Sequence, residues 1–102
     1  MSAELDIRQW VDGWLRDHRA QLQARHVTFK VDSVRNAHVP KGKAVLRLEA
    51  PASLMQVDLW GSGEADVMEL RHGNITSQHK RFTGQVSLLQ FLDSCFRKLA
   101  AG

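Results

Sequence analysis

The opening segment of the chain repeats apolar residues with the period of an α-helix. The apolar positions follow three- and four-residue spacing and are Ile7, Trp10, Val11, Trp14, Leu15 and Leu22. This spacing gathers them on one face and leaves the charged residues on the other. We therefore expect a helix over about residues 3–25. Within it Gly13, which is unfavourable in a helix interior, indicates a close approach by another element.

From Val27 onward the apolar period shortens to about 2, which is typical of β-strands. The pattern predicts strands over residues 27–32, 43–50, 54–60, 64–71 and about 75–82. Residues 36–42 are expected to form a loop because they contain Pro40 and Gly42. The remaining connections are a few residues long, and such connections join antiparallel neighbours. The sheet is therefore expected to be an antiparallel meander of about five strands.

The last segment returns to helical spacing. Ser87 followed three residues later by Gln90 predicts a capping box, with Ser87 as the N-cap residue. The buried stripe is expected to contain Leu88, Leu92, Cys95, Phe96 and Leu99, with Phe91 beside it. The order α-β-β-β-β-β-α predicts an α+β domain in which the N-terminal and C-terminal helices pack on one face of the sheet.

Length and composition favour one domain over residues 1–102, since 102 residues with 43% hydrophobic residues suffice for one core. A single cysteine cannot form an internal disulfide, which favours a reducing compartment. We see no signal peptide and no apolar stretch of about 18 residues, so we expect a cytoplasmic protein with no membrane partner. The net charge of +3 is scattered along the chain and indicates no partner by itself.

The residue types that usually carry catalysis form no recognisable constellation. Cys95 falls in the apolar stripe, which predicts a buried structural thiol. His72 and His79 are expected near each other on adjacent strands, but two solvated histidines are favoured over a metal site. Ser62 lies in a predicted hairpin, whereas a nucleophile elbow needs a strand-to-helix turn. We therefore expect a binding protein that is not an enzyme and uses no cofactor or metal.

A candidate binding surface lies around Trp60. Strand alternation places Trp60 on the face opposite Met55 and Val57, and an exposed tryptophan beside acids has the composition of an interface hot spot. The alternative is that a helix or a bulge covers it. Nearby acids could form a local acidic patch, or could simply solvate the sheet. These acids are Asp58, Glu64 and Asp66.

The stretch Leu54–Leu70, which contains Trp60-Gly61-Ser62-Gly63-Glu64, resembles the TriTu family of bacterial immunity proteins. That family has a strand ending in Trp-x-Ser-Gly-Glu, followed by a second alternating strand. Residues 44–49 with Pro51, and the opening helix, also look like the family. The resemblance implies a cytoplasmic antitoxin to an Rhs-type toxin of type VI secretion. The toxin would be an ADP-ribosyltransferase acting on elongation factor Tu, and the antitoxin would occlude its active cleft.

The candidate toxin-binding residues are Asp58, Trp60, Ser62, Glu64 and Asp66. An alternative function is a small basic nucleic-acid-binding module that uses Lys30, Arg47, Lys80 and Arg81. Against it stands the lack of paired aromatic residues on adjacent strands for base stacking. A third alternative, a small enzyme using His72 and His79, needs a cleft between the helices and the sheet.

Overall fold

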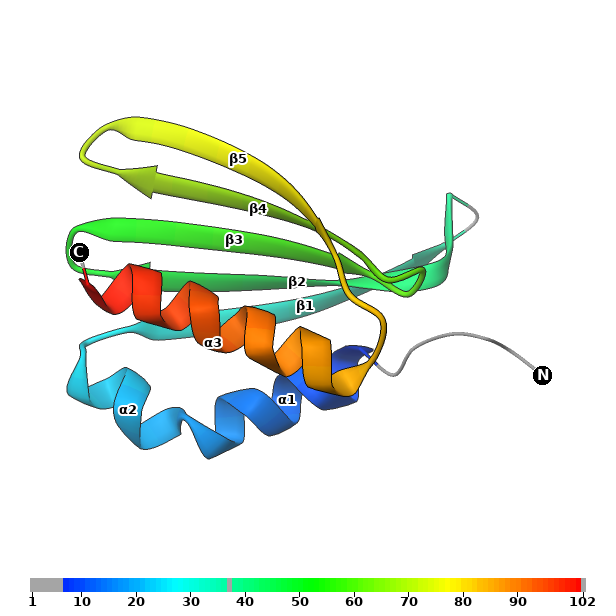
Figure 1. Ribbon diagram of the computed structural model, residues 1–102, viewed down its shortest axis with the longest axis horizontal. Helices are drawn as coiled ribbons and strands as arrows, with labels where there is room; N and C mark the ends of the chain where they lie inside the picture. Colours follow the sequence, from blue (N-terminus) through cyan, green and yellow to red (C-terminus); the bar gives the residue numbers. More distant parts are fainter. Residues whose placement is uncertain (1–6, 37, 102) are drawn as a thin grey trace.

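The computed structural model describes residues 7–36 and 38–101, which form helices on one side of an antiparallel sheet (Figure 1). In chain order the elements are α1 (Ile7–Asp17), α2 (Arg19–Ala24), β1 (Thr28–Asn36), β2 (Val39–Ala50), β3 (Ser53–Trp60), β4 (Glu64–Arg71), β5 (Asn74–Arg81) and α3 (Gln85–Ala101). The predicted α+β class and element order are confirmed. Among the described residues, no helix is both long and apolar enough to cross a membrane.

The five strands follow one another across the sheet in the order β1-β2-β3-β4-β5, and each pairs antiparallel with its sequence neighbour. The turn after β3 needs a residue in the left-handed region, and Gly63 supplies it with φ 96°. The amide of Gly63 closes this turn by donating to the carbonyl of Trp60 at 3.0 Å. The glycine-rich hairpin predicted from the sequence is therefore present.

The core lies between the helices and one face of the sheet, which we call the inner face. Its buried members on the strands include Leu46, Leu48, Met55, Val57 and Leu59, and those on the helices include Val11, Trp14, Leu22, Leu88, Leu92 and Leu99. α1 contacts β2 and α3 contacts β3, while β4 and β5 curve away from the helices (Figure 1). Consequently all eight residues of β5 are exposed.

The predicted N-terminal helix is not continuous. Residues 3–6 lie outside the described part of the chain, and the helix is interrupted at His18, between α1 and α2. The His18 ring nitrogen Nδ1 lies 2.9 Å from the carbonyl oxygen of Trp14, which also accepts the His18 amide at 3.0 Å. Because one carbonyl serves both groups, the backbone departs from helical geometry there, with φ −105° and ψ 6°.

Two other local predictions are wrong. Residues 36–42 do not form an open loop, because β2 begins at Val39 and pairs with Asn36 in a tight hairpin. Pro40 is tolerated there because the pairing with β3 extends only to Lys43, so this end of β2 has a neighbour on one side. Gly13 marks no close approach: an added Cβ would meet only the end of the Arg16 side chain, at 3.7 Å.

The N-terminus of α3 is capped differently from the prediction. The helix begins at Gln85, so Ser87 lies inside its first turn and is not the N-cap residue. The Ser87 hydroxyl instead reaches back and accepts hydrogen bonds from the amides of Thr83 at 2.9 Å and Gly84 at 3.3 Å. Ser87 therefore satisfies free amides before the helix. In a capping box this role belongs to the side chain at N3, the third residue of the helix, and Ser87 occupies that position.

Candidate protein-binding face

The face of the sheet opposite the helices, which we call the outer face, is covered by no helix in the part of the chain that the structure describes. Strand alternation directs Asp58 and Trp60 of β3, and Glu64 and Asp66 of β4, to this face. Four of the five residues predicted to bind a partner are thereby brought together. The fifth, Ser62, is exposed in the adjoining turn, where its hydroxyl lies 3.4 Å from Glu64 Oε2.

Trp60 lies on the outer face as the alternation predicts, but it is half-buried and not fully exposed. The cover comes from a side chain and not from a helix: the Lys43 ammonium lies 5.2 Å from the centre of the Trp60 ring. The same ammonium is 3.4 Å from Asp58 Oδ2. Lys43 thus links the tryptophan and the acid through a cation–π contact and an ion pair.

Each acid of the predicted acidic patch lies beside a basic side chain. His79 Nδ1 lies 2.6 Å from Asp66 Oδ1, and Arg81 Nη2 lies 3.8 Å from Glu64 Oε1. Together with the pair of Lys43 and Asp58, each acid of the patch has a cationic or imidazole partner on an adjacent strand. The patch is therefore an ion-paired network whose members can exchange partners.

Sequence reasoning missed a group of apolar side chains on the same face, of which three are exposed and Leu54 is half-buried. It consists of Leu54, Met68, Leu70 and Ile75, and we call it the apolar cluster. Leu54, Leu70 and Ile75 lie side by side in register across β3, β4 and β5. Ile75 is 66% exposed, and Met68 and Leu70 are each 37% exposed. These residues could have been found from strand alternation, which places them on the outer face once the register of each hairpin is known.

The groups considered for catalysis do not assemble. His72 lies in the turn after β4 with φ 52°, while His79 bonds to Asp66. Within residues 7–36 and 38–101 no group of three or more histidine, cysteine or acidic residues could hold a metal ion. Cys95 is buried as predicted, and burial raises the pKa of its thiol to about 11, so the thiol stays protonated at neutral pH.

The cations considered for nucleic-acid binding are divided between the two faces. Arg47 and Arg81 lie on the outer face, where Arg47 bonds to Gln56 at 3.1 Å and Arg81 pairs with Glu64. Lys80 lies on the inner face, one residue out of phase. Trp60 is the aromatic residue of the outer face among the described residues, so two stacked bases would have no paired aromatic platform there.

No family model, no curated protein and no solved structure matches the chain. The outer face is a candidate binding surface because of its own geometry: no described helix covers it, an apolar cluster lies at one end, and the pair of Trp60 and Lys43 lies at the other.

Proposed function

We propose that the protein binds a partner protein through the outer face of its sheet. The observation that carries this proposal is the apolar cluster, in which Met68, Leu70 and Ile75 are exposed side by side on adjacent strands. Contiguous exposed apolar side chains bordered by polar groups are typical of protein interfaces. The ion-paired network next to the cluster supplies such a polar border.

The partner we propose is a toxin of the class implied by the resemblance to TriTu immunity proteins. The chain would act in the cytoplasm, bind an ADP-ribosyltransferase toxin without catalysis or a cofactor, and occlude its active cleft so that elongation factor Tu is protected. The support is the Trp60-Gly61-Ser62-Gly63-Glu64 motif, which the fold places in the hairpin at the edge of the outer face.

Two ends of the outer face would contribute differently to binding. The apolar cluster loses water-exposed area on contact, and this drives association. Trp60, which is half-buried and has the Lys43 ammonium over its ring, would anchor the opposite end. The acids Asp58, Glu64 and Asp66 could exchange their present partners for cations of the toxin, which favours orientation more than affinity.

The test is calorimetric titration of the protein with the toxin encoded beside its gene. We expect Ile75→Asp to weaken binding at least about tenfold, because it places a charge in the apolar contact. Trp60→Ala should weaken it about 30-fold or more. Val86→Asp is the matched control, since Val86 is 71% exposed but belongs to α3, on the other side of the sheet.

Unchanged toxin binding by folded Ile75→Asp and Trp60→Ala variants would refute the outer face as the binding surface. Far-ultraviolet circular dichroism of each variant shows whether it is folded. Affinity for a generic oligonucleotide that falls steeply with salt would instead support the nucleic-acid alternative.

A further inference from the structure

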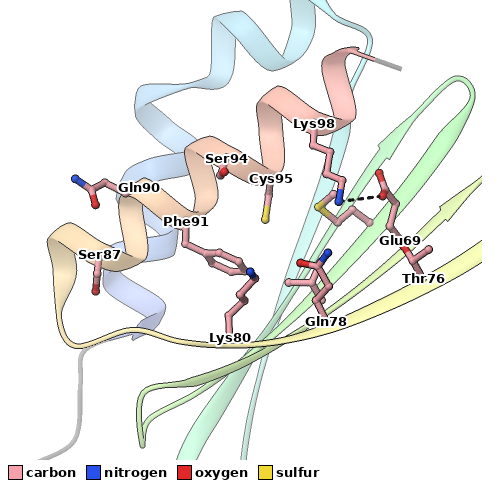
Figure 2. Close-up of a pocket in the computed structure, with 12 residues that line it drawn as sticks. Glu69, Thr76, Gln78, Lys80, Ser87, Gln90, Phe91, Ser94, Cys95 and Lys98 are labelled. Atoms are coloured by element: carbon pink, nitrogen blue, oxygen red, sulfur yellow. Dashed lines mark ion pairs between the residues drawn. The ribbon is translucent and has the colours of Figure 1, made fainter.

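The inner face of the sheet carries a groove where β4 and β5 curve away from α3 (Figure 2). Its volume is about 360 Å³, at the lower end of the range of small-molecule sites. α3 forms one wall from Ser87 to Lys98, β5 forms the other, and Met55 and Val67 form the floor. Eleven residue steps of an α-helix make this wall about 16 Å long, so the groove is elongated.

Both walls present polar side chains that have no partner among residues 7–36 and 38–101. β5 contributes Thr76, Gln78 and Lys80, and α3 contributes Gln90 and Ser94. Among the described residues, none of these side chains makes a hydrogen bond or an ion pair. Lys80 is notable because it is charged and points inward from an edge strand, where strand alternation directs its neighbours His79 and Arg81 outward.

The charges of the groove favour an anion. Glu69, the acid of the groove, is 7% exposed and already has two cations, with Lys98 Nζ 3.7 Å from Oε1 and Arg71 Nη2 3.2 Å from Oε2. No carboxylate of the described residues pairs with Lys80, so its charge is not balanced by a neighbour in the groove. A bound carboxylate would form a charge-assisted hydrogen bond with the Lys80 ammonium.

The floor and the helix wall favour an apolar body on the same ligand. Met55 and Val67 form the floor, and Phe91 projects from α3 toward Lys80 across the groove (Figure 2). A flat or branched apolar group placed in this space would contact the Phe91 ring on one side and the floor residues Met55 and Val67 beneath it. The amides of Gln78 and Gln90 border this space and can bond to a neutral polar group of the ligand.

We infer that the groove between α3 and β5 binds an amphipathic carboxylate, with its charge at Lys80, its apolar body on Met55, Val67 and Phe91, and a neutral amide or hydroxyl toward Gln78 and Gln90. A small carboxylic acid and the C-terminal residue of a peptide share this chemistry. Because the groove lies on the inner face, the inference is independent of partner binding on the outer face.

The test titrates the isotopically labelled protein with N-acetyl-L-phenylalanine and follows its backbone amide signals by nuclear magnetic resonance. This probe carries the carboxylate, the ring and one amide. We expect shifts confined to α3, β4, β5 and the part of β3 around Met55, with a Kd of about 1 mM for a ligand of this size. The matched probe N-acetyl-L-phenylalaninamide lacks the carboxylate and should bind about tenfold more weakly or not at all.

Lys80→Met keeps the aliphatic stem but removes the charge, and should weaken binding of the acid about tenfold while leaving the weak binding of the amide unchanged. The control is Lys30→Met, which removes another exposed lysine, on the outer face of β1, and this variant should bind the acid as the parent does. Equal affinity for acid and amide, an unaffected Lys80→Met, or no shifts in the groove would each overturn the inference.

The two sources of the carboxylate are separated with the peptide Gly-Ser-Gly-Phe. Affinity about tenfold above that of N-acetyl-L-phenylalanine would support the carboxylate site and assign it to a peptide C-terminus, since the extra residues then contact the 16 Å wall. Equal or lower affinity for the peptide, with the acid still bound, would support the site and assign it to a small molecule.

Discussion

The indole Nε1 of Trp14 donates a hydrogen bond to Asp93 Oδ1 at 2.8 Å and so joins α1 to α3. The same carboxylate oxygen lies 3.2 Å from His18 Nε2, and the His18 ring stacks on Trp14 with centroids 4.4 Å apart. Phe96 meets the Trp14 ring edge-on at 6.3 Å. Asp93 is therefore the polar centre of an otherwise aromatic contact between the helices.

Replacing Asp93 by alanine should destabilise the fold by about 1–2 kcal/mol, because the Trp14 side chain is buried and its N–H would lose its acceptor. Urea denaturation followed by tryptophan fluorescence measures this loss. Asp12→Ala is the control, since Asp12 pairs with Arg8 on the surface of α1 and its loss should cost no more than about 0.5 kcal/mol.

A double-mutant cycle isolates the hydrogen bond itself. In a Trp14→Phe background the donor is already absent, so Asp93→Ala should cost clearly less than it does in the parent. Equal costs in the two backgrounds would show that Asp93 acts through His18 or through α3 alone.

The carboxylate of Glu69 is the buried member of its ion-paired group, while its partners reach solvent: the side chains of Arg71 and Lys98 are 29% and 52% exposed. Although Arg71 Nη2 is close to Glu69 Oε2, neither that oxygen nor Arg71 Nε has a hydrogen-bond partner among the described residues. Removing a cation leaves a buried charge less compensated, whereas removing the acid leaves cations that water can solvate.

We therefore expect Arg71→Met to destabilise the protein by about 2 kcal/mol and Glu69→Met by less than about 1 kcal/mol. Chemical denaturation of both variants at neutral pH gives the two values. A larger loss for Glu69→Met would mean that the ion pairs contribute more than burial of the carboxylate costs.

Stability should fall in alkaline solution because of Cys95. Burial raises the pKa of its thiol from 9.0 to about 11, so between these values the unfolded chain releases the proton while the folded chain keeps it. The contribution is fully present below pH 9 and is lost as the pH rises through 11. A shift of this size corresponds to about 2–3 kcal/mol.

Cys95→Ala is the comparison that separates this effect from the titration of lysines. Both proteins should lose stability above pH 9, but the parent should lose more, so the difference in free energy of unfolding between them should shrink toward pH 11. A constant difference over this range would contradict a thiol pKa raised by burial.

Gly13→Ala should stabilise the protein by up to about 1 kcal/mol. Gly13 lies in the interior of α1, and the added methyl group would meet only the end of the Arg16 side chain, at an ordinary contact distance of 3.7 Å. The midpoint of thermal unfolding should rise by a few degrees. A lower midpoint would indicate that α1, which ends just before His18, requires the backbone flexibility of glycine at position 13.

The sheet could be predicted because each strand pairs with its neighbour in sequence, so alternation and turn residues determine its order. The buried face of α3 was predictable for a similar reason, because its stripe follows helical spacing. The break at His18 could not be predicted. It depends on the partners of the His18 ring, which are Trp14 and Asp93, and Asp93 is far away in sequence.

The candidate site was predicted only in part. Alternation correctly placed Trp60 and Asp58 on the same face, but the basic side chains beside the acids come from β2 and β5, whose registers the sequence does not give. The inner-face groove was invisible for another reason: it exists because α3 leaves β4 and β5 uncovered, which depends on how the helix crosses the sheet.

The meander has a consequence for how the chain folds. Its hairpins close over connections of a few residues, so their entropic cost is small, whereas the contact of Trp14 with Asp93 joins residues 79 apart in sequence. Contacts between residues close in sequence cost less chain entropy to form, so they tend to form before contacts between distant residues. We therefore expect the sheet to assemble hairpin by hairpin and the docking of α1 against α3 to follow.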